Sequence, residues 1–171
     1  MKLNKDELKL SVIMPCYNEK DTLEDVIDSV RDCGIKNLEI IIVDDYSTDG
    51  TRELLQTELG KKADRVLYHK RNMGKGAALR NGFSAATGDL VVVQDADSEY
   101  DPKDYLVLIE PFTTGRGDAE VVYGSRYARS EKYMIKRFYQ LLRPIWIDVH
   151  CAEIERASIR FIDLLDLCDA K

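Results

Sequence analysis

The sequence predicts an α/β fold, with a mostly parallel sheet covered by helices on both faces. Strand-like apolar runs alternate with helix-like segments over the first two thirds of the 171 residues. The strand-like runs are continuously apolar, which is typical of parallel strands buried on both faces. Strands separated by helices of this length imply right-handed βαβ units, and these build a parallel sheet.

Each expected element has a local signal. Five apolar runs predict strands at 10–14, 38–43, 65–69, 90–94 and 119–123, and Pro15 is expected to end the first strand. Helices are expected between them, at 22–33, 51–59, 74–86 and 102–112. The first helix carries apolar residues at i, i+3, i+4 and i+7, with Asp21 or Thr22 as its cap and Gly34 as its stop.

The pattern changes after residue 129, so we expect an α/β core at 1–129 and a separate helical segment at 130–171. Pro144 marks a break in that segment. Steps of four and three then predict one long helix with a narrow apolar seam, formed by Ile147, Cys151, Ile154, Ser158, Phe161, Leu165 and Cys168. The seam can pack on its own domain, pair with a second copy in a homodimer, or lie on a membrane.

Composition excludes several classes of function. The net charge of −6 gives little support for nucleic-acid binding, which needs clustered Lys and Arg. The four cysteines are too widely spaced for a zinc site or a disulfide framework, so we expect reduced thiols in a cytoplasmic protein. Neither a signal peptide nor a membrane-spanning run is expected, so any contact with a membrane would be peripheral.

Polar clusters follow three of the expected strands, at 15–19, 44–49 and 95–101. Ligands of open α/β sheets bind beyond the carboxyl ends of the strands. The three loops, which are far apart in the sequence, are therefore expected to meet at one edge and to bring carboxylates together.

Asp95 and Asp97 follow the valine-rich strand and are separated by one small residue. In an extended segment the two side chains point to the same side, where they repel unless a cation or a proton holds them. Mg²⁺ or Mn²⁺ that also binds a diphosphate would satisfy them, with Glu99 as a third ligand directly or through water. The alternative is a solvated acidic turn.

Other residues in these loops can either bind a ligand or stabilise the start of a helix. Asp45 can accept hydrogen bonds from a base or a ribose, and Asp49 is expected to cap the helix at 51. Tyr17 can stack on a base, and Glu19 either joins the site or serves the next helix N-terminus.

Two basic residues can bind a diphosphate. Lys75 lies in a glycine-rich helix start, and Arg126 can clamp phosphates or make a structural salt bridge. His69 and His150 have no motif around them, so we expect structural or surface roles.

Five motifs together resemble the family 2 glycosyltransferases of the GT-A fold, within the group of dolichol-phosphate mannosyltransferases and polyprenyl-phosphate glucosyltransferases. They are SVIMPCYNE at 11–19, IVDDYSTDGT at 42–51, NMGKGAALRNG at 72–82, DADSEYDP at 95–102 and GSRY at 124–127. The resemblance implies inverting transfer of a hexose from GDP-mannose or UDP-glucose to a polyprenyl or dolichyl phosphate. It implies Asp95 and Asp97 as catalytic metal ligands, assisted by Glu99. The donor-binding set is Pro15, Tyr17, Glu19, Val43, Asp45, Lys75, Ala96 and Arg126.

The resemblance covers residues 10–127, and it implies that the core at 1–129 binds a nucleotide sugar and that the helical segment at 130–171 is divergent. The group's Thr-Asp-x-x-Thr-Gly-like segment is not found between 130 and 171. An alternative is therefore a nucleotide-sugar-binding domain without transferase activity. A sugar-1-phosphate nucleotidyltransferase is a third reading, but it would carry a glycine-rich, basic loop where this chain has Pro-Cys-Tyr-Asn-Glu.

Overall fold

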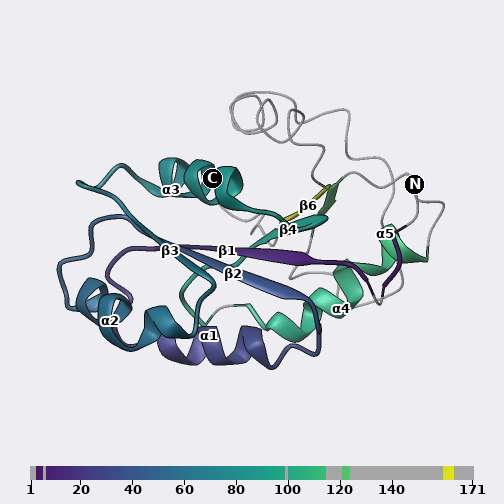
Figure 1. Ribbon diagram of the computed structural model, residues 1–171, viewed down its shortest axis with the longest axis horizontal. Coiled ribbons are helices and arrows are strands. Elements are labelled where there is room, and N and C mark those ends of the chain that lie inside the picture. The colour runs from purple at the N-terminus through teal and green to yellow at the C-terminus, as the bar shows by residue number, and fades with distance from the viewer. Residues whose placement is uncertain (1–2, 6, 99, 115–120, 124–159, 164–171) are drawn as a thin grey trace, which may run out of the picture.

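The computed structural model describes residues 3–5, 7–98, 100–114, 121–123 and 160–163 (Figure 1). Within these ranges the chain forms one six-stranded sheet in the order β3-β2-β1-β4-β6-β5, and every neighbouring pair is parallel. The strands are β1 Leu10–Cys16, β2 Leu38–Asp44, β3 Arg65–Tyr68, β4 Leu90–Val93, β5 Val121–Tyr123 and β6 Arg160–Asp163. The predicted parallel sheet is confirmed.

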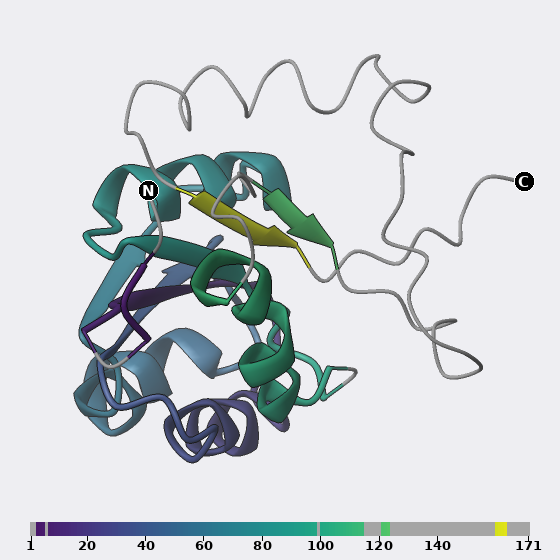
Figure 2. The ribbon, with the colours of Figure 1, turned by 90° about the vertical axis from the view of Figure 1, so that its right-hand side faces the viewer.

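Helices cover both faces of the sheet, as predicted. The helix α3 (Lys75–Ala85) lies on one face, and the others lie on the opposite face (Figures 1 and 2). These are α1 Leu23–Arg31, α2 Thr51–Thr57, α4 Tyr105–Leu108 and α5 Glu110–Thr113, with single 3-10 turns at Leu59–Lys61 and Pro102–Asp104. The single helix expected at 102–112 is thus three short pieces. None of the helices in the described ranges is long and apolar enough to cross a membrane.

Two layers of apolar side chains hold the helices on the sheet. All four residues of the predicted α1 face are buried, and they join the main core beneath the strands. On the other face, Leu79 and Phe83 of α3 pack against Ile13. Gly82 lets α3 approach the sheet closely, because a Cβ at this position would collide with the side chain of Ile13.

The first strand does not end at Pro15, contrary to the prediction. It runs to Cys16, and Pro15 is aligned with Val43 of β2. Cys16 O accepts from Asp45 on the β2 side, whereas Ile13 O accepts from Gln94 on the β4 side. The backbone of Pro15 therefore faces β4 as Ile13 does, and the pairing with β4 has already ended at Ile13. The missing N–H costs no ladder hydrogen bond there.

The prediction of one long helix up to Cys168 is wrong at 160–163, because these residues form strand β6. This strand lies between β4 and β5 and is parallel to both. Residues 160–163, Arg-Phe-Ile-Asp, include only two apolar residues, and a pattern this short cannot distinguish a strand from a helix. The other seam positions lie outside the described residues, and the boundary at 129 stays a prediction.

A buried polar network joins three segments near the amino ends of β1 and β2. Ser11 Oγ donates to Glu39 Oε2 over 2.6 Å, and the Thr87 amide donates to the same oxygen over 3.0 Å. Burial alone would raise the pKa of Glu39, but these hydrogen bonds outweigh it and hold the pKa below its ordinary value. The network lies at the opposite edge of the sheet from the predicted site.

Candidate functional site

The three predicted loops meet at the carboxyl edge of the sheet. The loop after β1 is tied to the loop after β2, because the Asn18 amide donates to Ser47 Oγ over 2.9 Å and the Thr48 amide donates to Asn18 Oδ1 over 2.8 Å. The loop after β4 joins them through Ala96 O, which accepts from Thr22 Oγ1 over 2.9 Å. The meeting predicted from the strand ends is therefore confirmed.

Thr22 links the start of α1 to two candidate residues. It occupies the N-cap position, but its side chain makes no capping hydrogen bond. Its hydroxyl lies 2.9 Å from both Glu19 Oε2 and Ala96 O, and these two acceptors share its single hydrogen. Thr22, which was expected to cap α1, therefore connects Glu19 in the loop after β1 to Ala96 in the loop after β4.

The paired acids Asp44 and Asp45 have separate environments. Asp44 is fully buried and accepts from Arg52 Nε over 2.7 Å. The Arg52 guanidinium lies over the rings of Tyr46 and Tyr68, at 5.2 and 5.3 Å from their centroids. Asp44 therefore has a structural role, and its partner Arg52 is held in place by Tyr46 and Tyr68.

Asp45 anchors the loop that begins α3. Its carboxylate accepts from the amides of Met73 and Gly74 over 2.7 Å each, and His69 Nδ1 lies 2.7 Å from Oδ1. Its side chain is 5% exposed. Asp45 thus shapes the site in this structure, and its predicted contact with a nucleoside remains untested. His69 is buried, in keeping with the structural role expected for it.

Lys75 and Asp95 form an ion pair across the site. Lys75 Nζ lies 2.7 Å from Oδ1 and 2.8 Å from Oδ2 of Asp95. The side chains are 47% and 27% exposed, respectively, so both are open to solvent. Lys75, which was predicted to bind a diphosphate at the start of α3, therefore also lies beside Asp95, the first acid of the Asp-x-Asp pair.

Asp95 and Asp97 are both partly exposed at the end of β4, and Ala96 between them is buried. Carboxylate oxygens at this place suit a hard divalent cation that completes its shell with water or phosphate oxygens. No group of three His, Cys, Asp or Glu residues that could hold a metal occurs among the described residues. Glu99 and Arg126, the other two candidates at this site, lie outside them.

Pro15 and Val43 are aligned with each other at the penultimate positions of β1 and β2, below these loops. Val43 is fully buried, so its side chain belongs to the core, whereas Pro15 is partly exposed. Cys16 follows Pro15 as a free, buried thiol. Burial, and after it the negative charges of Asp44 and Glu19, raise the pKa of the Cys16 thiol far above its ordinary value. It remains protonated and cannot supply a thiolate nucleophile.

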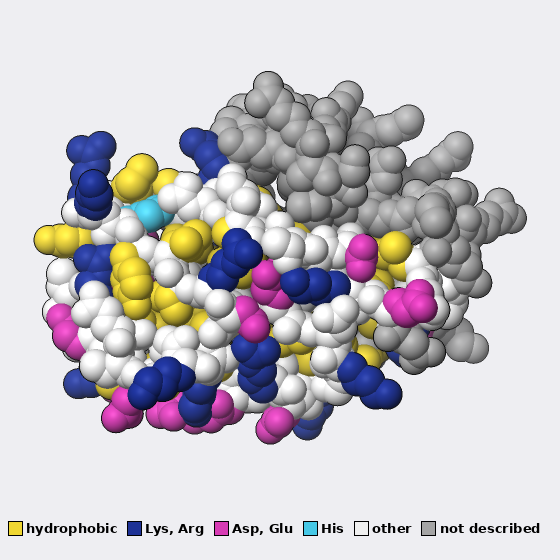
Figure 3. All heavy atoms as spheres, in the orientation of Figure 1, with side chains coloured by type: hydrophobic (Ala, Val, Ile, Leu, Met, Phe, Trp, Pro, Cys, Tyr) yellow, Lys and Arg dark blue, Asp and Glu magenta, His cyan; other side chains and the backbone are white. Residues whose placement is uncertain are grey.

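Large apolar side chains are exposed around the same edge. Tyr17 is 47% exposed and Met73 is 52% exposed, and the space-filling view shows hydrophobic and basic side chains gathered beside the histidine (Figure 3). Asn18 and Tyr46, in the loops after β1 and β2, have positive φ angles of 59° and 69°. Non-glycine residues adopt this conformation rarely, and such strain concentrates at binding sites.

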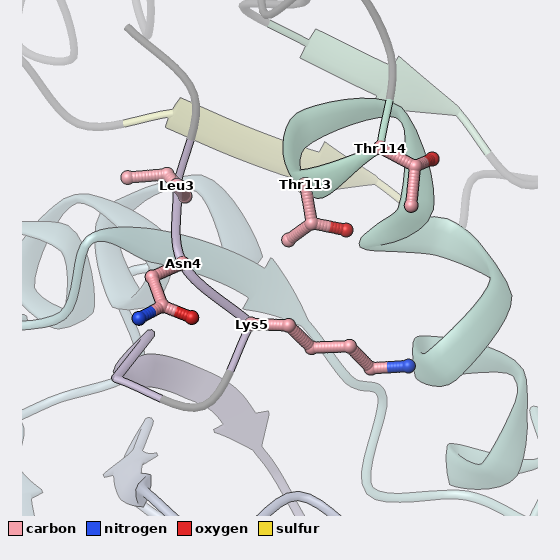
Figure 4. Close-up of a pocket in the computed structure, with 5 residues that line it drawn as sticks. All are labelled: Leu3, Asn4, Lys5, Thr113 and Thr114. Atoms are coloured by element: carbon pink, nitrogen blue, oxygen red, sulfur yellow. The ribbon is translucent and has the colours of Figure 1, made fainter.

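Two hollows lie outside this edge. One of about 380 Å³ is lined by Leu3, Asn4, Lys5, Thr113 and Thr114, beside α5 and away from the loops after β1, β2 and β3 (Figures 1 and 4). The other, of about 500 Å³, lies along β3 and α3 and is lined in part by His69 and Asn81. Only the second adjoins the candidate site.

Comparison with known proteins agrees with this arrangement. The model of the family described as Glycosyl transferase family 2 matches residues 11–165. The chain belongs to glycosyl transferase family 2. A family 2 relative, dolichol-phosphate mannosyltransferase of Pyrococcus furiosus, is 36% identical over 137 residues, covering 79% of this chain and 38% of that protein. Undecaprenyl-phosphate 4-deoxy-4-formamido-L-arabinose transferase of Aeromonas hydrophila is 35% identical over 147 residues, covering 82% and 44%.

Solved structures of glycosyltransferases share this fold. Glucosyl-3-phosphoglycerate synthase of Mycobacterium tuberculosis, in complex with Mn²⁺, UDP and glucosyl-3-phosphoglycerate, is 32% identical with a TM-score of 0.57, over 73% of this chain and 47% of that one. A mannosyltransferase of Pyrobaculum calidifontis, in complex with GDP-Man and Mn²⁺, is 26% identical with a TM-score of 0.58, over 73% and 38%. This family 2 chain thus spans less than half the length of these relatives.

Proposed function

We propose that this chain binds a nucleoside-diphosphate sugar through a divalent cation and forms the donor half of an inverting hexosyltransferase. The observation that carries the proposal is the meeting of three loops at one sheet edge, with Asp95 and Asp97 at the end of β4. The family assignment supports the reaction class. The relatives crystallised with UDP or GDP-Man and Mn²⁺ support the donor class and the cation.

Asp95 and Asp97 would hold Mg²⁺ or Mn²⁺, and Glu99 would assist them. The bound cation would neutralise charge on the departing nucleoside diphosphate. Lys75, already beside Asp95, would face the same phosphates. Tyr17 is exposed enough to stack on the base, and Glu19 lies beside it in the same loop. Arg126 would contact the diphosphate, because a guanidinium can bind two phosphate oxygens.

The acceptor would be a polyprenyl or dolichyl phosphate presented at a membrane surface. Two relatives named as a dolichol-phosphate and an undecaprenyl-phosphate transferase support this class of acceptor. The protein would then work as a peripheral partner of the cytoplasmic membrane face. Pairing of two copies through the segment 130–171 remains a prediction.

Calorimetric titration with GDP or UDP, with and without Mn²⁺, tests the proposal. Asp97→Ala should remove the metal-dependent part of nucleotide affinity and leave the fold intact, because it deletes a ligand at the partly exposed end of β4. Asp32→Ala removes the same charge at the far end of α1 and serves as the control. Equal metal dependence in the parent and Asp97→Ala would refute the assignment.

A transfer assay with GDP-mannose or UDP-glucose and a short polyprenyl phosphate tests the reaction itself. The expected product is a glycosylated lipid phosphate that forms only with a divalent cation. Metal-dependent nucleotide binding without any product would instead identify a binding domain that lacks turnover.

A further inference from the structure

His69 is held from both sides by polar side chains. Nδ1 lies 2.7 Å from Asp45 Oδ1, and Nε2 lies 2.7 Å from Asn81 Nδ2 on α3. The carboxylate oxygens of Asp45 can only accept, so Nδ1 carries a proton and donates to Asp45, and the Asn81 amide group faces Nε2. The ring is therefore held between the Asp45 carboxylate and the Asn81 amide.

The backbone of His69 is fixed as well. Its amide donates to Asp44 O over 2.9 Å, and its carbonyl oxygen accepts from Arg52 Nη2 over 2.6 Å. The backbone of His69 cannot shift without breaking these bonds to β2 and α2. The direction of the ring is set by its contacts with Asp45 and Asn81.

Asp45 connects His69 to the loop at the start of α3. Asp45 holds the Met73 and Gly74 amides, and Gly74 adopts a φ of 83° that favours glycine. The next residue is Lys75, which pairs with Asp95 at 2.7 Å. One connected series of hydrogen bonds and backbone thus leads from Asn81 on the exposed side of α3 to the first acid of the Asp-x-Asp pair.

We propose that His69 and Asn81 are positioning residues, which hold Asp45 and the 72–75 loop in the arrangement that receives the nucleotide sugar. This inference rests on the proposed function. The two residues would act through Asp45, which His69 contacts directly. A preorganised loop binds a ligand more tightly, because less ordering is needed when the ligand arrives.

Two substitutions at His69 separate positioning from packing. In His69→Asn the amide nitrogen is bonded to Cγ, as Nδ1 is, so a donor to Asp45 remains. In His69→Gln the amide nitrogen is one bond further out, as Nε2 is, so the donor to Asp45 is lost. Both variants lose the ring and should lose similar stability in urea, which makes each the other's control.

Nucleotide affinity and amide exchange then give two independent readouts. With GDP or UDP and Mn²⁺, His69→Gln should weaken binding by about tenfold, and His69→Asn by no more than about threefold. Hydrogen exchange at the Met73 and Gly74 amides should accelerate by about tenfold in His69→Gln only. If the parent binds no nucleotide, the proposed function fails, and the exchange rates still decide whether His69 positions the loop.

Asn81 provides a test if both His69 variants fail to fold. Nitrogen NMR of the parent should show the Nδ1–H form of His69. Asn81→Ala, on the exposed side of α3, should keep the Nδ1–H form, because Asp45 still accepts from it, but should weaken nucleotide binding, whereas Ser84→Ala on the same helix should not weaken it. A ring without a proton on Nδ1 in the parent would overturn the proposal. So would equal affinity and equal exchange in His69→Asn and His69→Gln.

Discussion

Lys75 Nζ lies within 2.8 Å of both carboxylate oxygens of Asp95, so one ammonium group covers the first acid of the Asp-x-Asp pair. A divalent cation at Asp95 would have to share this carboxylate with Lys75 or displace it. The position of Lys75 at the start of α3 would keep its charge near any phosphate bound there. Binding of a metal ion at Asp95 and binding of a donor phosphate near Lys75 would therefore affect each other through this ion pair.

Lys75→Met should raise the affinity for Mn²⁺ alone by about threefold, because a half-exposed ion pair is worth only a fraction of a kcal/mol up to about 1 kcal/mol. The same variant should weaken binding of GDP or UDP with Mn²⁺, because a cation beside the phosphates is lost. Calorimetry with Mn²⁺ alone and with Mn²⁺ plus nucleotide measures both effects. Lys70→Met, an exposed change in the preceding loop, should alter neither value.

Arg52→Ala should lower the free energy of unfolding by about 3 kcal/mol, because it leaves the fully buried Asp44 without its charged partner. Arg52→Lys should recover only part of the loss, since an ammonium group cannot lie flat over Tyr46 and Tyr68. Urea denaturation measures both variants. Adding Asp44→Asn to Arg52→Ala should restore stability, and a purely additive double variant would argue against the buried charge as the cause.

Glu39→Gln should destabilise the protein at pH 7 by about 1–2 kcal/mol, because the carboxylate accepts hydrogen bonds in a buried network. The folded pKa of Glu39 is lowered, so its stabilisation is complete above the unfolded pKa and is lost as the pH falls through the folded pKa. Urea denaturation from pH 7 downward should show a shallower acid slope in Glu39→Gln. Glu53→Gln, which is exposed on α2, should keep the parent's slope.

Gly82→Ala should cost about 1–3 kcal/mol, because the added methyl group collides with Ile13 and pushes α3 away from the sheet. Ordinary helix propensity predicts the opposite sign, since alanine favours helices over glycine. Thermal or urea denaturation decides between them. Ser84→Ala lies on the same helix but is exposed, and it should be neutral or slightly stabilising.

The order of elements up to β4 could be predicted from the sequence because each carries its own signal. The apolar spacing of α1 and the continuous apolar runs of β1, β2 and β4 depend on neighbours within a few residues. Strand β6 could not be predicted in this way. Its four residues, Arg160–Asp163, become a strand by pairing with β4 and β5, which are distant in the sequence.

The candidate site was predictable in outline, because the carboxyl ends of parallel strands gather their loops. The partners of Asp45 were not. Only the fold brings His69 and the Met73 and Gly74 amides to its carboxylate, and no spacing in the sequence indicates that contact. The contact between Asn81 on α3 and the ring of His69 could not be predicted either, for the same reason.

The place of β6 between β4 and β5 has a consequence for synthesis on the ribosome. Strands β1 to β4 pair with one another, so the emerging polypeptide can close their hydrogen bonds once residue 93 has left the exit tunnel. Strand β5 must wait for Arg160–Asp163 to be translated before it gains its neighbour. A pause in translation between these points would expose an open β4 edge, a vulnerable surface for chaperones to cover.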